Sequence, residues 1–328
     1  MVRHSGRHSE AKPVVVVAGP TASGKSRLAL DLAEACDGVV INADSMQIYR
    51  ELAILTARPK AADLARAPHR LYGVLPGRER CSAGRWRALA VAEIEACHAA
   101  GTLPIVTGGT GLYLRALEKG LAAVPAVPAE TRAAAEARHA ELGGAAFHAA
   151  LAARDPAMAA RLRPSDRQRL IRAWEVIQAT GRSLADWQRA GTGDSNGPAP
   201  YRFLTLVCLP PRADVYAACD ARVHAMIAAG ALAEVRALLA LNLDSALPVM
   251  KALGVAALSR HLAGSLSLEA AVAAMQQQTR NYAKRQMTWL RTQLVPAHPE
   301  ARVLTAQYSE SLRAEIFTNI RQNLLTAC

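Results

Sequence analysis

Residues 19–26, with the sequence GPTASGKS, have the side chains and spacing of a phosphate-binding loop. They match the pattern G-x-x-x-x-G-K-[ST] at every position. Glycines let backbone N–H groups curl around an oxyanion, Lys25 adds a full positive charge, and the Ser26 hydroxyl can ligate the Mg²⁺ that accompanies a diphosphate. We therefore expect a diphosphate or a nucleotide to bind to Gly19, Pro20, Thr21, Ala22, Ser23, Gly24, Lys25 and Ser26.

Two other segments place polar groups where buried strands should end. Asp44 follows the apolar run 39–43, and Thr110 follows two glycines after the run 103–107. Ligands bind beyond the carboxyl ends of parallel strands, so Asp44 is expected beside the phosphate loop, although an N-cap role fits it equally well. The Gly-Gly-Thr turn can offer N–H groups and a hydroxyl to a second phosphate, or it can serve tight packing of the next helix.

The elements that must position these groups alternate as in an α/β protein. The valines at 14–17 have the composition of a strand buried on both faces of a parallel sheet. Further strands are predicted at 39–43, 103–107 and 201–209, and helices at 27–35, 82–98, 213–229, 232–241 and 275–294. The fold prediction is therefore an α/β protein with a P-loop NTPase-like parallel sheet.

The composition changes in the middle of the chain. An alanine- and arginine-rich helical stretch without a strand signal lies between a proline-bounded hinge at 124–128 and a glycine-rich return at 191–198. This pattern predicts a helical insertion at 124–198, with residues 13–123 and 199–328 forming the α/β core. Residues 1–12 are polar and basic, and we expect a disordered tail there.

One helix of the predicted insertion has two distinct faces. Residues 165–168 form a capping-box pattern, after which Leu170, Ile171 and Trp174 give an apolar side. Gln168 and Arg172 share another face, with Arg169 beside them. An arginine-lined face can hold phosphates, whereas most charged helix faces are simply solvated. The surplus of arginines over acids between positions 161 and 172 favours phosphate binding.

The overall composition points to a polyanionic partner. The 328 residues carry a formal net charge of +12, which suits nucleic acid, although a basic protein can also gain solubility from such charge. Six cysteines show neither a CxxC pair nor metal-ligand spacing, as expected for buried thiols in a reducing cytosol. With no signal peptide, membrane-length apolar run or coiled coil, we expect a soluble, cytoplasmic monomer.

Seven stretches, taken in order, resemble the bacterial tRNA dimethylallyltransferases of the IPP transferase family. They are residues 19–26, 41–49, 56–59, 68–71, 103–117, 166–176 and 283–291, so the resemblance extends from Pro13 to about Arg291. The phosphate loop is shared by many enzymes, whereas DSMQIY, GGTGLY and RQMTWLR are far more specific. The resemblance implies transfer of a dimethylallyl group from dimethylallyl diphosphate to the N6 amine of the adenine 3′ of the anticodon, which gives N6-isopentenyladenosine and diphosphate.

The resemblance also implies roles for individual residues. Asp44 would be the general base, Thr110 would lie beside the diphosphate oxygens, and Arg222 would neutralise the leaving diphosphate together with Lys25 and Mg²⁺ on Ser26. The target adenine would leave the anticodon-loop stack to reach them. The implied tRNA contacts, which would make the helical insertion a tRNA-binding domain, are Asp44, Ser45, Met46, Gln47, Arg132, Gln168, Arg169, Leu170, Ile171, Arg172, Lys251, Ala252, Leu253, Gly254, Val255 and Ala256.

The chain departs from the family pattern at four positions. Leu55 stands where a glycine is usual and Arg58 where a lysine is usual. Val255 replaces a tyrosine in a tRNA-contacting turn, and Ala218 replaces an arginine one turn before Arg222.

Two other functions compete with prenyl transfer. A small-molecule kinase would use the same loop for ATP, with the arginine-rich insertion as its lid, but it leaves DSMQIY and GGTGLY unexplained. A non-catalytic nucleic-acid-binding ATPase is compatible with the basic charge. However, no apolar strand ends in the acidic pair typical of ATP-hydrolysing motors.

Overall fold

The computed structural model describes residues 11–191, 197, 200–309, 312–314, 316–318 and 320. It divides into two compact units, which we call the core unit (1–118 with 199–328) and the helical unit (119–198). Nearly all of the predicted tail and most of the predicted return at 191–198 lie outside the described residues. Within them, the first strand already begins at Lys12.

The core unit is built on a parallel sheet in the order β3-β2-β4-β1-β5-β6. Every described pairing is parallel, and Val17 of the central strand pairs with Thr107 on one side and Leu206 on the other. The predicted strands are all present, and the short edge strands β3 and β6 are additional. The strands are β1 (Lys12–Ala18), β2 (Gly38–Asn42), β3 (His69–Arg70), β4 (Leu103–Gly108), β5 (Tyr201–Cys208) and β6 (Arg302–Leu304).

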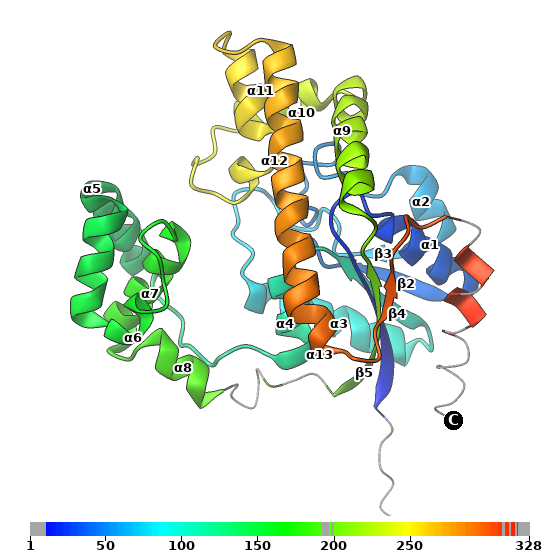
Figure 1. The fold of residues 1–328 in the computed structure, drawn as a ribbon, viewed down its shortest axis with the longest axis horizontal. Helices are drawn as coiled ribbons and strands as arrows, with labels where there is room; N and C mark the ends of the chain where they lie inside the picture. Colours follow the sequence, from blue (N-terminus) through cyan, green and yellow to red (C-terminus); the bar gives the residue numbers. More distant parts are fainter. Residues whose placement is uncertain are drawn as a thin grey trace, which may run out of the picture. The chain divides into compact units, whose positions relative to one another are not determined.

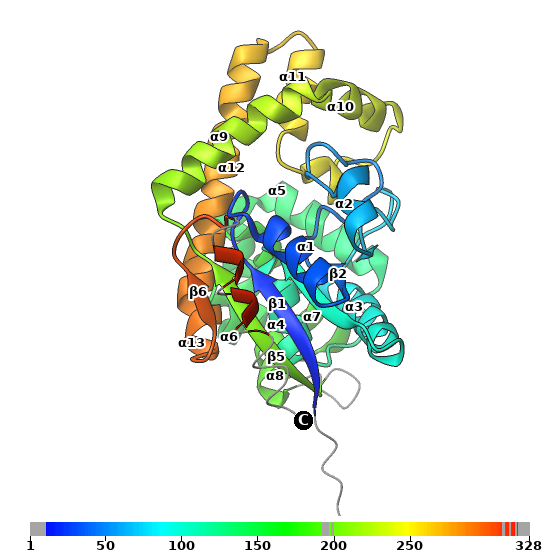
Figure 2. The same ribbon diagram turned by 90° about the vertical axis from the view of Figure 1, so that its right-hand side faces the viewer.

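Helices cover both faces of this sheet, as a parallel sheet requires (Figures 1 and 2). Val15 and Val17 of β1 pack toward α1 (Lys25–Ala35), whereas Val14 and Val16 pack into a second cluster on the other face. The elements that supply this second cluster include α3 (Ala83–Ala99), α4 (Gly111–Lys119), α9 (Arg212–Ala228) and α12 (Leu268–Trp289). The valine run is thus buried on both sides because each face has its own hydrophobic core.

Helices α1 and α3 begin close to the positions that the sequence predicts. Helix α1 begins two residues earlier than predicted because Gly24, with φ of +86°, turns the phosphate loop directly into it. Ser82 caps α3 as predicted, since its Oγ accepts a hydrogen bond from Arg85 N at 3.1 Å. The other elements are α2 (Ala61–Arg66), α10 (Ala231–Ala240), the 3₁₀ turn η2 (Val249–Lys251), α11 (Val255–Leu262), the π-helical η3 (Leu290–Leu294) and α13 (Val295–Ala297).

Among the described residues, no single helix has the length and apolar character needed to cross a membrane; α9 and α10 meet that test only when joined, and they are bent by 67°.

The helical unit has its own hydrophobic core, in which Phe147, Leu170 and Trp174 are buried. Its described helices are α5 (Ala129–Arg154), α6 (Pro156–Ala159), α7 (Arg167–Thr180) and α8 (Leu184–Ala190). The predicted capping box is wrong: the N-cap of α7 is Asp166, and it makes no side-chain cap hydrogen bond. Ser165 lies in a turn before the helix, where its carbonyl accepts from Arg167 N.

Candidate active site

Three loops of the core unit meet at the carboxyl edge of the sheet. The phosphate loop follows β1, Asp44 follows β2, and the Gly-Gly-Thr turn follows β4. Because these strands are neighbours in the order β2-β4-β1, their carboxyl ends bring the three loops together. The structure therefore joins Lys25, Asp44 and Thr110, which the sequence placed far apart, in one site.

The phosphate loop is tightly folded around its own backbone. A Cβ atom on Gly19 would lie 2.5 Å from the buried Ser23 hydroxyl, so this position has room only for glycine. Lys25 Nζ donates to the carbonyl oxygen of Pro20 at 3.1 Å. Burial lowers the pKa of Lys25 to about 8, although the carboxylate of Asp44 acts in the opposite direction. An anion in the loop would restore the full charge of this lysine.

Asp44 is held by a buried asparagine at the end of β2. Asn42 Oδ1 accepts from Asp44 N at 2.7 Å, and its Nδ2 donates to the Asp44 and Leu71 carbonyls at 3.0 Å. Asp44 Oδ1 in turn accepts from Met46 N at 2.9 Å. The other carboxylate oxygen has no hydrogen-bond partner among the described residues. Asp44 can therefore hold the turn through Oδ1 and act on a ligand through Oδ2, because the two roles use different oxygens.

Thr110 lies directly across from the Asp44 segment. Its Oγ1 accepts from Ser45 N at 3.1 Å. Sequence reasoning missed Tyr282 of α12, whose side chain lies close to Thr110 and Asp44. Burial raises the pKa of Tyr282, and the negative charge of Asp44 raises it further. A neutral phenol therefore lies beside the Thr110 hydroxyl and the carboxylate.

Arg222 brings a second cation to the site from α9. Its Nη2 donates to the Thr56 carbonyl at 3.2 Å. Burial lowers the pKa of Arg222, whereas Asp44 raises it, and the charge of Arg222 contributes to the lowered pKa of Lys25. Two partly buried cations and one carboxylate thus lie within electrostatic range of one another. This balance favours a ligand with several negative charges.

Gln286 of α12 links two of the three loops. This buried side chain accepts from Thr21 N at 2.8 Å through Oε1 and donates to the Gly109 carbonyl at 3.0 Å through Nε2. A Cβ atom on Gly109 would overlap Nε2 of Gln286, which explains the glycine. In this structure the Thr21 N–H is used by this glutamine, and binding of a diphosphate to Thr21 stays a prediction.

The departures at Leu55 and Arg58 are accommodated locally. Leu55 is buried and does not have a positive φ, so a glycine is not needed there. The N–H groups of this turn donate to the carboxylate of Glu234, at 2.9 Å in the case of Leu55 N. Arg58 Nη1 donates to the Tyr49 carbonyl at 3.1 Å. Val255 is buried and makes no polar side-chain contact, and nothing in the structure explains Ala218.

The candidate tRNA contacts of the core unit differ in exposure. Ser45, Met46 and Gln47 are partly exposed, and Gln47 Nε2 donates to the Thr56 carbonyl at 2.8 Å. Lys251 and Ala256 are exposed, and Leu253 is partly exposed. Ala252, Gly254 and Val255 are buried by packing, and their contact with tRNA stays a prediction.

The candidate contacts of the helical unit also separate into two groups. Gln168 and Arg169 are exposed, whereas Leu170 and Ile171 are buried in the unit's hydrophobic core, and contact of this run with tRNA stays a prediction. Two arginines are partly engaged by acids. Arg172 Nη1 lies 2.6 Å from the buried Glu175, and Arg132 Nε lies 3.0 Å from Glu136.

The described residues contain no cluster of three or more His, Cys, Asp or Glu side chains that could hold a metal ion. Ser26 is exposed at the start of α1, where its hydroxyl can reach a ligand in the loop. This donor set suits Mg²⁺ that takes most of its oxygen ligands from a diphosphate and from water.

The cysteines show the burial of ordinary thiols only in part. Cys97, Cys208 and Cys219 are buried as expected, whereas Cys36 and Cys81 are only partly buried. Cys328 lies outside the described residues.

Two protein families together match residues 12–293 of this chain. A family described as IPP transferase matches residues 47–293, and one described as isopentenyl transferase matches residues 12–79. A tRNA dimethylallyltransferase of Rhodospirillum centenum is 61% identical over 286 residues, which are 87% of this chain and 90% of that protein. The protein of the same name from Rhodospirillum rubrum is 57% identical, with 96% of each chain covered.

Solved structures resemble this fold as well. The tRNA isopentenylpyrophosphate transferase of Bacillus halodurans has a TM-score of 0.67 and 29% identity, with 97% of this chain and 98% of that chain covered. A eukaryotic dimethylallyltransferase acting on tRNA has a TM-score of 0.79 and 25% identity, with 95% and 80% covered. Given the extent of the family match and the identity to these relatives, the chain belongs to the IPP transferase family.

Proposed function

We propose that this chain transfers the dimethylallyl group of dimethylallyl diphosphate to the N6 amine of the tRNA adenine on the 3′ side of the anticodon. The observation that supports this most directly is the grouping of Lys25, Arg222 and Asp44 at the phosphate loop. Two cations suit a departing diphosphate, and a carboxylate suits an amine that must lose a proton. The names of the close relatives give the same donor group and acceptor class.

The reaction breaks one bond and forms another. The bond between the allylic carbon and the diphosphate oxygen breaks, and the electron pair leaves with the diphosphate. The adenine N6 forms a bond to that carbon, and its proton passes to Asp44. Because negative charge develops on the leaving oxygens, Lys25, Arg222 and the N-terminus of α1 stabilise the transition state more than the ground state. Thr110 and Tyr282 add neutral donors beside these groups.

Asp44 is suited to accept the proton because its orientation is fixed in advance. Its Oδ1 is held by Met46 N, so Oδ2 remains available for the amine. An exocyclic amine is a weak nucleophile, and a carboxylate within hydrogen-bond reach raises its reactivity as the C–N bond forms.

Mg²⁺ belongs to the same proposal. Ser26 would contribute its hydroxyl as one ligand. When bound, the ion would neutralise part of the diphosphate charge. Lys25 and Arg222 supply the remaining positive charge from this chain's own residues.

The tRNA would be held by exposed and partly exposed groups. In the core unit these are Ser45, Met46, Gln47, Lys251, Leu253 and Ala256, and in the helical unit Gln168, Arg169, Arg172 and Arg132. The target base must leave its stack, because N6 is otherwise shielded from a carboxylate at the bottom of a protein site.

Nucleoside mass spectrometry tests the proposal. The purified protein is mixed with an unmodified tRNA transcript, dimethylallyl diphosphate and Mg²⁺. A five-carbon gain on the adenosine next to the anticodon is expected. ATP consumption with a small hydroxyl acceptor, and no gain on tRNA, would instead support the kinase.

A further inference from the structure

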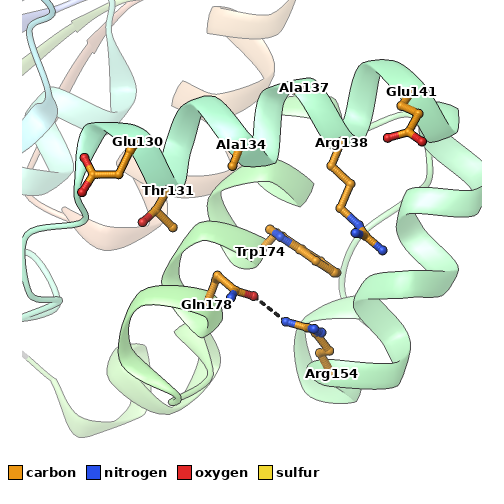
Figure 3. A pocket seen from close by; sticks show the side chains of 9 residues that line it. All are labelled: Glu130, Thr131, Ala134, Ala137, Arg138, Glu141, Arg154, Trp174 and Gln178. Atoms are coloured by element: carbon orange, nitrogen blue, oxygen red, sulfur yellow. Dashed lines mark hydrogen bonds between the residues drawn. The ribbon is translucent and has the colours of Figure 1, made fainter.

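The helical unit contains a cavity that the transfer reaction does not use. Its volume is about 730 Å³, and it opens beside the first part of α5 (Figure 3). The ring of Trp174 lies at its floor and is almost fully buried. The lining residues are Glu130, Thr131, Ala134, Ala137, Arg138, Glu141, Arg154, Trp174 and Gln178.

Two guanidinium groups lie against the tryptophan ring. The Cζ atoms of Arg138 and Arg154 are each 5.0 Å from the centroid of the Trp174 ring. The two Cζ atoms are therefore separated by no more than twice 5.0 Å. Cation–π contact holds both groups in place without neutralising them. Figure 3 shows the side chains of Arg138 and Arg154 beside the Trp174 ring.

Neither arginine forms a salt bridge within the described part of the chain. Arg154 donates to the neutral side-chain amide of Gln178, and among the described residues no carboxylate lies within salt-bridge distance of Arg138 or Arg154. A guanidinium has five N–H donors, so most of them remain available. Other arginines of this unit are paired: Arg172 with Glu175 and Arg189 with Asp186.

The shape and the charge pattern of the cavity fit a short piece of nucleic-acid backbone. Along α5 the wall beside the arginines is made of small side chains, Thr131, Ala134 and Ala137, which leave room for a ribose-phosphate chain. Glu130 and Glu141 lie near the two ends of this wall (Figure 3), roughly 16 Å apart at the helical rise. These carboxylates would repel phosphates beyond the ends and so limit the occupant to one or two.

We infer that the cavity floored by Trp174 binds phosphodiester groups of the tRNA backbone through Arg138 and Arg154. The inference rests on the proposed function, because it takes tRNA as the ligand. It adds a binding site apart from the exposed face of α7. Arginine suits this role, since its planar fork can hold two phosphate oxygens at once.

The sharpest test places a negative charge inside the cavity and leaves both arginines intact. Ala134 lines the cavity, whereas its exposed neighbour Ala133 on the same helix does not. Ala134→Glu and Ala133→Glu therefore change the net charge of the unit equally, and alanine and glutamate are both good helix formers. The readout is the Kd of an unmodified tRNA transcript over a series of salt concentrations.

We expect Ala134→Glu to weaken binding about tenfold near 0.1 M salt and to lower the slope of log K against log salt by about 0.7 to 1.5, as for the loss of one or two phosphate contacts. Ala133→Glu should stay within about twofold of the wild type. Equal effects of the two variants would overturn the inference, since they would show only a general charge effect.

A second pair of variants tests the arginines themselves. Arg138→Gln with Arg154→Gln should lower the salt slope, whereas Arg182→Gln should not, although Arg182 also covers a tryptophan, Trp187, at 4.4 Å in the same unit. Arg138→Lys with Arg154→Lys retains the charge and should retain the slope, which separates charge from packing on Trp174. The inference would be contradicted if the double lysine variant had a lower salt slope than the wild type. It would also be contradicted if the double glutamine variant kept the wild-type salt slope.

The inference and the proposed function can fail separately. Prenylation of the transcript by the wild type tests the transfer reaction. If transfer occurs and the two glutamate variants bind alike, only the cavity inference is wrong. If transfer fails but Ala134→Glu alone weakens binding, the cavity still binds RNA and the proposed reaction is wrong.

Discussion

The site at the strand ends and the surface of the helical unit hold their charged groups in different ways. In the core unit, Gln286 joins Thr21 to Gly109 and Arg222 contacts Thr56, so each contact connects segments more than 150 residues apart in the chain. In the helical unit, Arg169 lies near Asp166 and Arg172 contacts Glu175, both three residues away along one helix.

This difference matches what each region must do. Making a C–N bond requires a base, a donor group and a leaving group in one geometry, and small displacements cost rate. Attraction of an RNA backbone depends mainly on the number of charges and tolerates movement. We therefore expect substitutions in the core site to change turnover steeply and those in the helical unit to change affinity gradually and with salt.

The largest effect is expected from Asp44→Asn. The amide can still accept from Met46 N, so the loop should be preserved, but it cannot take the proton from N6. Turnover should fall by a factor of about 10² to 10⁴, the usual contribution of a general base. The Kd for tRNA should change by less than about tenfold. Single-turnover assays and binding measurements separate the two effects, and an unchanged turnover would exclude Asp44 as the base.

A smaller loss is expected from Gln286→Leu, which removes both links between the phosphate loop and the Gly-Gly-Thr turn. We expect kcat/KM for dimethylallyl diphosphate to fall by a factor of about 10 to 100, since the buried Thr21 N–H and Gly109 carbonyl lose their partners.

Gln278→Leu is the matched control for Gln286→Leu, because Gln278 is exposed on the same helix. Gln286→Glu tests the donor alone: the carboxylate could accept from Thr21 N but could not donate to Gly109. It should therefore not restore the wild-type value. Wild-type kinetics in both Gln286 variants would show that the two loops hold their positions without this bridge.

The pH dependence of diphosphate binding should reveal Lys25. Its pKa is lowered to about 8 by burial, and only the protonated form attracts the ligand. The lysine is largely charged below that pH and largely neutral above it, so kcat/KM should fall above pH 8 by about tenfold per pH unit. Calorimetry near pH 8 in two buffers should also show proton uptake on binding.

Lys25→Arg checks the assignment, since arginine remains charged throughout this range. This variant should be less active but should lack the alkaline decline. A decline that persists unchanged would assign the titration to another group.

The sequence predicted the strand-end loops well because each carries its own local signal. The valine run, the glycines of the phosphate loop and the position of Asp44 after an apolar run all depend on neighbouring residues. Gln286, Tyr282 and Glu234 could not be placed in this way, because their partners lie far away in the chain. They depend on how α12 and α10 pack, which spacing along the chain does not reveal.

The same limit applies in the helical unit. The 3.6-residue spacing correctly placed Leu170 and Trp174 on an apolar face. The resemblance then assigned a continuous run of residues to RNA contact, although a helix buries part of any such run. The capping pattern failed because Ser165 forms a turn before the helix, and that turn depends on the preceding residues rather than on the four-residue motif.

The smallest expected effect separates two arginines of α7. Arg169 is exposed and lies 3.9 Å from Asp166, so Arg169→Gln should lower the salt slope of tRNA binding by about 0.7 to 0.9 and leave the melting temperature unchanged. Arg172→Gln should lower the melting temperature, because buried Glu175 would keep, among the described residues, only Arg132 at 4.0 Å as a cationic partner. Salt-series binding and thermal unfolding of both variants decide the matter. If Arg169→Gln binds like the wild type at every salt concentration, the exposed face of α7 is a solvated surface, and the RNA contacts of the helical unit must lie elsewhere.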